Sequence, residues 1–393
     1  MKSKPAKSVI EIWLGGGPSQ LETFDPKPDA PREVNNGMKA IPTNASFQVH
    51  EWLPKLAQCA DLYSVVRTLT HPHGGHETAA YLMQTGRNPG GGVVYPALGA
   101  MISSMKRKSY QGDLPPFVIL TQGKGRFSEI GFLGEEHAPL VTGGNPNSAR
   151  FVVDGIVPPG GITNEELDRR FELAARLDRL PRDPAFEAAG AAARKIITGT
   201  AAQTFDLALE SKETRDRYGR NVFGQSLLAA RRLVEYGVPY ISVNYMGIWD
   251  SHKRHFETIR RPTEDVDTAV SALLTDLKAR NLLDGTIVWM TGEFGRTVKI
   301  DMDPTWQGGR HHFPRCFSAL VAGGGFKGGL AVGKSDDTAA NVKERPVSPA
   351  DFLGSICELA GINPDDRLPN ARGFELPVLP PASEIGRLKE IYA

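Results

Sequence analysis

The sequence predicts an α/β protein: a three-layer fold with a mostly parallel central sheet and helices on both of its faces. Two observations predict this class. Short runs of β-branched and apolar residues alternate with segments of helical periodicity along nearly the whole chain. Residues that can bind ligands or catalyse reactions, mainly His, Asp, Glu and Arg, follow several of these runs directly. The carboxyl ends of parallel strands are where such sheets form ligand sites. A chain of 393 residues, 40% of them hydrophobic, is long enough to bury the core that such a sheet needs.

Strands are expected where β-branched and aromatic residues cluster between turn signals. The first expected strand, SVIEIWL (8–14), ends in three glycines and Pro18, which permit an unusual turn. The run TIVWM (286–290) follows the turn pair Asp284-Gly285 and stops at Thr291-Gly292. The same reasoning predicts further strands at residues 62–67, 116–121, 151–153, 238–245, 317–322 and 330–333.

Helices are expected where apolar residues recur at spacings of three and four. Residues 263–281 show this most clearly, and shorter helices are predicted at 51–60, 78–85 and 349–360. Residues 164–236 are predicted to be mostly helical, with charged and solvated faces. The chain is therefore expected to form a single domain over residues 1–393, in which part of 164–236 is a helical insertion, cap or subdomain.

Composition excludes several functions. Forty-six basic residues nearly cancel forty-five acidic ones, so no overall field favours nucleic acid. No apolar run reaches the length of a membrane span, and the short basic start (1–8) has no apolar stretch behind it, so the chain as given predicts no export signal. The pattern G-x-G-x-x-G at 323–328 precedes a predicted strand and no helix, which argues against a dinucleotide site. Compartment and oligomeric state are not indicated.

Polar clusters follow four of the predicted strands. If those strands run parallel, their carboxyl ends and the clusters meet at one edge of the sheet. Two of the clusters lie early in the chain, at Glu22/Asp25 and at His71–His76, and two lie late, at Asp250/His252 and at Glu293–His312. Within the second cluster His71 and His73 are expected to be polar loop residues, whereas His76 is placed at a helix N-terminus, which favours an anion.

The residue types in these clusters predict a divalent metal. Mixed imidazole and carboxylate ligands favour zinc or manganese over calcium or magnesium, which prefer oxygen. Two metals about 4 Å apart need roughly six ligands, and the chain can supply them. The expected ligands are Asp25, His76, Asp250, His252, Glu293, His311 and His312.

Six stretches carry a resemblance to a known family: GGGPSQLETFDPKPDAP (15–31), VRTLTHPHGGHETAAYLMQTGR (66–87), YGRNVFGQSLLAARRLVEYGV (218–238), WDSH (249–252), GEFGRT (292–297) and GRHHF (309–313). The layout is similar to that of the alkaline phosphatase and sulfatase superfamily, and the whole chain resembles the bacterial sulfatase-like family called domain of unknown function 1501. The resemblance implies a metal-dependent hydrolase of phosphate or sulfate esters, with a small-molecule or glycan ester as substrate.

Carried over by position, the resemblance shows where this chain departs from the superfamily. Thr85-Gly86-Arg87 fixes a register that places His76 at the position of the sulfatase nucleophile. The aspartate of the first strand would fall at Gly15 or Gly16, so its role is vacant unless Glu22 or Asp25 reaches back. Where the superfamily has Asp-His after the late strand, this chain has Glu293-Phe294, one ligand fewer. In the motif GRHHF (309–313), His311 stands where the closer family usually has an aspartate, and His312 stands where it has a histidine.

Two mechanisms stay open on this evidence. Either His76 is a covalent nucleophile, or it is a metal ligand and water attacks directly; the second is favoured because imidazole is a common ligand. Arg296 and Arg310 are expected to be catalytic by clamping the anion, and Thr78 and Arg87 to contact the substrate. The alternative function is a catalytically inactive protein of the same fold that binds an anionic glycan or a protein partner.

Overall fold

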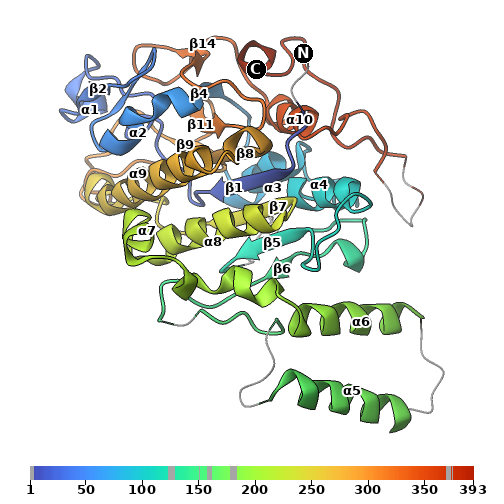
Figure 1. The fold of residues 1–393 in the computed structure, drawn as a ribbon. Coiled ribbons are helices and arrows are strands. Elements are labelled where there is room, and N and C mark those ends of the chain that lie inside the picture. Colours follow the sequence, from blue (N-terminus) through green and yellow to red (C-terminus); the bar gives the residue numbers. More distant parts are fainter. Residues whose placement is uncertain are drawn as a thin grey trace.

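The protein is described by a computed structural model that covers residues 4–122, 129–149, 151–156, 162–177, 184–368, 373 and 375–393. Its centre is an eight-stranded sheet in the order β12-β4-β11-β8-β1-β7-β5-β6 (Figure 1). The strands are β1 (Ser8–Trp13), β4 (Tyr63–Leu69), β5 (Phe117–Leu120), β6 (Leu140–Val141), β7 (Tyr240–Asn244), β8 (Thr286–Thr291), β11 (Phe317–Ala322) and β12 (Ala331–Val332).

Strand direction sets where the loops meet. In this sheet β1 pairs in parallel with β7 and β8, β5 pairs in parallel with β6 and β7, and β12 with β4. Strand β11 is antiparallel to both of its neighbours, β4 and β8. The carboxyl ends of β1, β4, β7 and β8 therefore lie at one edge, and β11 starts from that same edge. The predicted mostly parallel sheet is confirmed.

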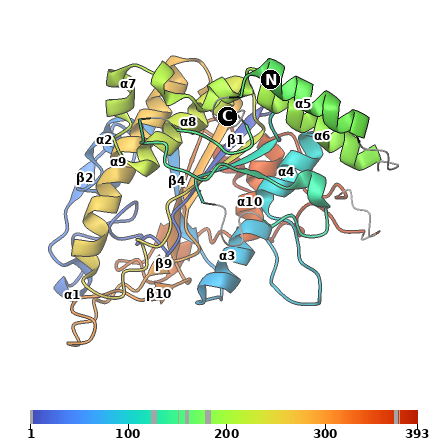
Figure 2. The same ribbon diagram turned by 90° about the horizontal axis from the view of Figure 1, so that it is seen from below.

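Helices cover both faces of the sheet, as Figures 1 and 2 show. Successive residues of β1 point to opposite faces. Ile10 and Ile12 join the core under one set of helices, while Val9 and Trp13 join the core under the other. The first set is α2 (Pro54–Gln58), α8 (Val222–Tyr236) and α9 (His255–Ala279), and the second is α3 (His76–Thr85), α4 (Leu98–Lys106) and α10 (Pro349–Leu359).

The insertion expected within 164–236 contains two helices that project from the body (Figure 1). Helix α5 (Asn164–Leu177) has no buried residue, and α6 (Pro184–Thr198) is joined to it by an ion pair of 2.8 Å between Arg194 and Asp168. Residues 178–183 lie outside the described residues. Helix α7 (Lys212–Arg217) and α8 then return the chain to the sheet. That this segment forms a cap or subdomain stays a prediction.

The remaining elements are short. They are α1 (Arg32–Asn35) and the paired strands β2 (Ala40–Pro42) with β3 (Gln48–His50), β9 (Gly295–Arg296) with β10 (His312–Phe313), and β13 (Lys334–Ser335) with β14 (Val342–Glu344). Pairing of β9 with β10 holds the two ends of the loop after β8 together. Among the described residues, no helix combines the length and the apolar character needed to cross a membrane.

Two sequence predictions were wrong in detail. Residues 151–153 form no strand, although Phe151 and Val153 are buried in the core. Helix α9 begins at His255 and not at residue 263, because Pro262 is accommodated inside the helix. The prediction that a strand and no helix follows the glycine pattern at 323–328 is confirmed, because β12 comes next and pairs in parallel with β4.

Candidate metal and active site

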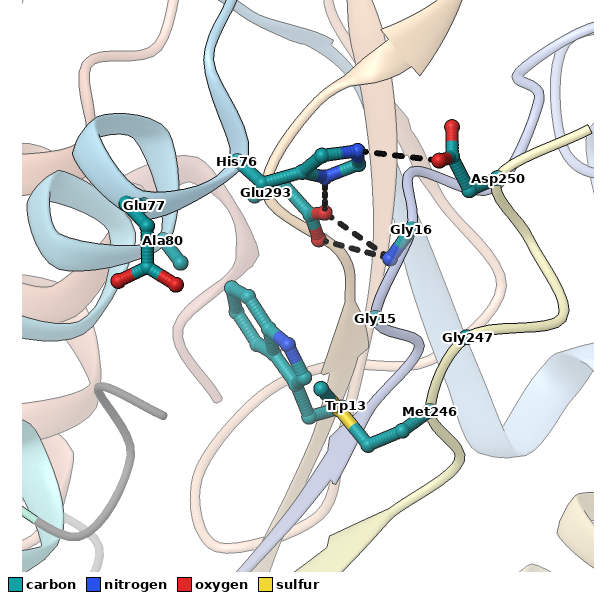
Figure 3. A pocket seen from close by; sticks show the side chains of 10 residues that line it. All are labelled: Trp13, Gly15, Gly16, His76, Glu77, Ala80, Met246, Gly247, Asp250 and Glu293. Atoms are coloured by element: carbon teal, nitrogen blue, oxygen red, sulfur yellow. Dashed lines mark hydrogen bonds and ion pairs between the residues drawn. The ribbon is translucent and has the colours of Figure 1, made fainter. Parts of the chain in front are cut away.

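Three side chains and one backbone amide, from the ends of four strands, converge at the common edge of the sheet. His76 is the first residue of α3, after β4; Asp250 follows β7; and Glu293 follows β8. Gly16 stands in the turn after β1, and Figure 3 shows it beside the other three residues. The sequence hypothesis that distant segments meet at one rim is therefore supported by the geometry for these residues.

Glu293, which the sequence predicted as a metal ligand, lies behind His76 and orients it. Its Nδ1 lies 2.6 Å from Glu293 Oε1, and the same carboxylate accepts hydrogen bonds from the Gly16 amide at 2.9 and 3.2 Å (Figure 3). A carboxylate accepts, so the proton of neutral His76 is on Nδ1 and the lone pair of Nε2 points forward. That Nε2 lies 3.4 Å from Asp250 Oδ2. The hydrogen bond to Glu293 also raises the pKa of His76, against the effect of burial.

His312 is fixed in the same way by a backbone carbonyl. Its Nδ1 lies 2.7 Å from the Gly74 oxygen, which can only accept. Its Nε2 lone pair therefore faces Asp250 Oδ1 at 3.2 Å and His252 Nε2 at 2.9 Å. Burial lowers the pKa of His312 and of His252, which favours their neutral forms. Neutral imidazole is the form that binds metals.

His252 receives its orientation through two further residues. His311 Nε2 lies 2.9 Å from Asp301 Oδ2, and since the carboxylate accepts, this nitrogen carries the proton. His311 Nδ1 is then an acceptor, and it lies 2.8 Å from His252 Nδ1. His252 therefore donates from Nδ1, and its Nε2 lone pair faces Asp250 Oδ1 at 3.0 Å. The predicted ligand His311 lies behind the cluster and supports His252.

The donor set fits a borderline divalent metal. Ligand atoms of His76, Asp250 and His312 all lie within 4.8 Å of one another, and His252 Nε2 adjoins them. In a tetrahedral zinc site, bonds of roughly 2.0 to 2.1 Å place neighbouring ligand atoms about 3.3 Å apart. The separations from Asp250 oxygens to the three Nε2 atoms, 3.0 to 3.4 Å, are of this size. Imidazole lone pairs that converge on a carboxylate in this way are suited to hold a divalent cation.

Asp250 is held ionised by a buried arginine. Arg296 is fully buried, and its Nη2 donates to Asp250 Oδ1 at 2.6 Å. Burial tends to raise the pKa of Asp250, but Arg296 and the nearby imidazoles outweigh it and lower the pKa to about 2. The other donors of Arg296 reach the backbone carbonyls of Gly16, Gly17 and Arg310. Arg296 thus stabilises the frame of the site and Asp250, and its predicted role as a clamp on substrate stays a prediction.

Gly16 is required by its conformation and by the space around it. Its φ of +116° lies in a region that residues with a Cβ atom avoid. A Cβ there would lie 2.6 Å from the Asp250 amide nitrogen. The turn after β1 can therefore reach Asp250 and Glu293 only without a side chain at this position. The position where the resemblance would place an aspartate is occupied here by backbone.

A pocket of about 260 Å³ opens beside the cluster. Figure 3 shows its polar end at His76, Asp250 and Glu293 and its apolar end at Trp13 and Met246. The complete lining is Trp13, Gly15, Gly16, His76, Glu77, Ala80, Met246, Gly247, Asp250 and Glu293.

Three predicted site residues are not brought to the cluster. Asp25 was expected to bind metal, but its Oδ1 lies 3.0 Å from Lys27 Nζ and its Oδ2 accepts from Ser335 Oγ. Arg310 was expected to be catalytic, but it is fully buried and pairs with Glu22 at 2.9 Å. Arg87 lies beyond the far end of α3, where its Nη2 donates to the Pro377 oxygen at 2.7 Å. The charged groups of Asp25, Arg310 and Arg87 thus make structural contacts away from the cluster.

Thr78 lies in the first turn of α3, exposed, with its hydroxyl 3.1 Å from the Gly75 oxygen. It adjoins the residues of the pocket without lining it. A contact between Thr78 and substrate stays a prediction.

A buried ionic network supports the cluster and was not foreseen. Glu22 Oε2 lies 3.0 Å from His255 Nε2, and His255 Nδ1 lies 2.6 Å from Ser251 Oγ, next to Asp250 in sequence. Burial tends to raise the pKa of Glu22, but Arg310 and His255 outweigh it and hold the pKa well below its usual value. Glu22 and His255 are fully buried. The network ties the loops after β1, β7 and β8 to one another.

His71 supports Glu293 from the other side. Its Nδ1 accepts from the His73 amide at 3.2 Å, so its Nε2 carries the proton and donates to the Glu293 carbonyl at 2.7 Å. Burial lowers the pKa of His71 to about 4. The expected loop residue is thus a neutral hydrogen-bond donor. His73 is hydrogen-bonded to Asn88 at 2.8 Å and does not contact the cluster.

Comparison with known proteins agrees with the resemblance carried by the motifs. The family model described as "Protein of unknown function (DUF1501)" matches residues 6–385. The chain belongs to the DUF1501 family. No curated protein matches this DUF1501 chain.

Several solved structures are similar to this DUF1501 protein at low identity. The PsFucS1 sulfatase from Pseudoalteromonas sp. is 13% identical, with a TM-score of 0.41 over 91% of this chain and 68% of that one. The lipoteichoic acid synthase LtaP from Listeria monocytogenes is 9% identical, with a TM-score of 0.42 over 95% and 74%. The alkaline phosphatase from the Antarctic bacterium TAB5 is 11% identical, with a TM-score of 0.40 over 91% and 99%. The reaction of the DUF1501 protein has to be inferred from its own site.

Proposed function

We propose that this protein is a metal-dependent hydrolase of small phosphate or sulfate esters. The proposed metal is zinc or manganese, held by His76, Asp250 and His312, with His252 as a further ligand. One observation carries the proposal: the Nε2 lone pairs of three imidazoles converge on Asp250, and each imidazole is held from behind by an acceptor. Outer hydrogen bonds of this kind accompany histidine ligands of metals.

The ion, when bound, would supply positive charge that polarises the ester and a water molecule. The residues of the chain have distinct tasks around it. Glu293 keeps the proton of His76 on Nδ1 and so keeps Nε2 available. Arg296 balances part of the negative charge of Asp250. The Gly16 amide is already bonded to Glu293, so it is not a donor for substrate oxygen.

The orientation of His76 supports the role of ligand over that of nucleophile. Its Nε2 faces Asp250 Oδ2 at 3.4 Å and lies in the group of converging ligand atoms. A nucleophile would need this lone pair directed at the substrate. Direct attack by water is therefore the proposed route.

Turnover of 4-nitrophenyl phosphate and 4-nitrophenyl sulfate with added Zn²⁺ or Mn²⁺ tests the proposal. We expect hydrolysis of at least one ester, lost on chelation, and a decrease of about 100-fold or more in His76→Ala or His312→Ala. His73→Ala is the matched control, since His73 belongs to the same histidine run but contacts Asn88. No turnover of either ester with either metal would refute the hydrolase. An equal loss in His73→Ala would refute the assignment of the site.

A binding protein without turnover is the second candidate. It is favoured by the lining of the pocket, which contains no serine, threonine or cysteine among the described residues. Such a protein would bind Zn²⁺ and a phosphate ester in stoichiometric amounts and release no product. Equilibrium binding combined with product analysis separates this candidate from the hydrolase.

A further inference from the structure

The pocket beside the cluster has two chemically different ends. His76, Asp250 and Glu293 form the polar end, while Trp13, Ala80 and Met246 form the apolar end (Figure 3). An ester group bound at the metal ligands would therefore have its organic part directed to Trp13 and Met246, with Ala80 and the charged Glu77 of α3 at one side. Resting on the proposed function, this arrangement bears on the substrate that the site accepts.

Glycines keep one wall of the pocket flat. Gly15, Gly16 and Gly247 line it, and none of them has a side chain that narrows the space. A Cβ on Gly15 would lie 2.5 Å from Met246 Sδ. The backbone of this wall thus lies close to Met246 while the space in front of it stays open. A flat wall beside an indole and a thioether is suited to a planar or disc-shaped apolar group.

The volume limits what fits. About 260 Å³ is below the range of roughly 300 to 1,000 Å³ that is typical of sites for drug-sized ligands. A single ring is accommodated, whereas an oligosaccharide is not enclosed. A sugar ring would place hydroxyl groups against Ala80 and Met246, whose side chains offer no hydrogen-bond partner, and Glu77 could accept from the hydroxyl groups on one side only. Hydroxyl groups left unpaired in the pocket are unfavourable.

We propose that the pocket receives a single apolar ring, aromatic or alicyclic, as the organic part of the ester. The substrate class is then a phosphate or sulfate monoester of a small cyclic alcohol or phenol. Ala80 sits one helical turn after His76 on α3, so both residues face the same pocket. The residue that binds the metal and the residue that borders the ring are thereby set at a fixed spacing.

Binding of phenylphosphonate and methylphosphonate to the Zn²⁺-loaded protein tests the proposal, because neither compound has an ester bond and leaving-group effects are absent. Isothermal titration calorimetry is expected to give about 10- to 100-fold tighter binding of the phenyl compound, the effect of burying one aromatic ring. Ala80→Phe fills the pocket and is expected to abolish this preference. Met246→Ala is expected to reduce it several-fold.

Ile248→Ala is the matched control. Ile248 is 37% exposed in the same loop as Met246 but does not line the pocket, so the preference should persist. Equal binding of the two phosphonates, or tighter binding of glucose 6-phosphate than of phenylphosphonate, would overturn the proposal. A phenyl preference in a protein that hydrolyses no ester would uphold the pocket and refute the proposed reaction, so the two failures are distinguishable.

Discussion

Asp301 lies two hydrogen bonds behind the candidate metal, and its replacement tests how His252 is oriented. The chain runs from Asp301 Oδ2 to His311 Nε2 at 2.9 Å and from His311 Nδ1 to His252 Nδ1 at 2.8 Å. In Asp301→Ala, His311 loses the acceptor that fixes its tautomer. His311 can then carry its proton on Nδ1, which forces the proton of His252 to Nε2 and removes a metal ligand.

The expected size of the effect follows from the position of each residue. Outer-shell partners of metal-bound histidines contribute about 10- to 100-fold to metal affinity. We expect Asp301→Ala to weaken Zn²⁺ binding about 10-fold, because it acts through one intermediate imidazole. His311→Ala should approach about 100-fold, because His311 contacts His252 directly. Equilibrium dialysis against a Zn²⁺ chelator measures both without depending on activity.

Two further variants make the experiment decisive. Asp301→Asn keeps an oxygen that accepts from His311 and should restore affinity to within about 3-fold of the native protein. Asp303→Ala removes a carboxylate of the same loop that accepts from the Thr305 amide at 2.8 Å, and it should leave affinity unchanged. Native affinity in Asp301→Ala, or an equal loss in Asp303→Ala, would refute the tautomer chain.

Two predictions concern stability. Glu22→Gln leaves the buried Arg310 without its carboxylate and should lower the free energy of unfolding, measured in urea, by about 3 to 5 kcal/mol. Glu264→Gln breaks an exposed pair with Arg260 and should cost about 0.5 kcal/mol or less. Similar losses in both variants would contradict a special role of burial. Burial raises the pKa of Glu11 to about 7, despite hydrogen bonds from Gln84 and Tyr240. Between about pH 4.5 and 7 the folded protein therefore holds a proton on Glu11 that the unfolded chain releases. The free energy of unfolding should fall over this range as pH rises, by up to about 1.4 kcal/mol per pH unit. Glu11→Gln should remove this contribution to the slope.

The sequence located the site because parallel strands bring their carboxyl ends to one edge. This topology was enough to predict that His76, Asp250, His252 and His312 come together, although they are spread over more than half of the chain. Imidazole and carboxylate side chains of the kind that suit a divalent metal were recognisable from residue type, and their binding of zinc stays a prediction. The roles within the set were not, because they depend on which ring nitrogen meets which acceptor.

Charge burial was the main feature that the sequence could not reveal. Arg310 looks like an anion clamp next to His311, yet its guanidinium is enclosed with Glu22. Asp25 lies in the loop after β1, one of the strands that end at the site. Its two carboxylate oxygens nevertheless contact Lys27, close in sequence, and Ser335, distant in sequence. Asp301 carried no signal because its role arises from a contact with His311 that only the folded loop provides.

Strand β11, the one strand of the central sheet that runs antiparallel to its neighbours among the described residues, has a consequence for how the site is assembled. Because β8 and β11 are neighbours, residues 292–316 leave the sheet and re-enter it at the same edge. One excursion thus supplies Glu293, Arg296, His311 and His312, with both of its ends anchored in the middle of the sheet. Its outermost part, residues 302–308, also contacts the loop after β7: the Trp306 ring lies against His252 and His311, and the His255 amide donates to the Gly308 oxygen at 3.3 Å. A change in the length of this excursion would therefore reach the histidines of the cluster as well as the rim of the site.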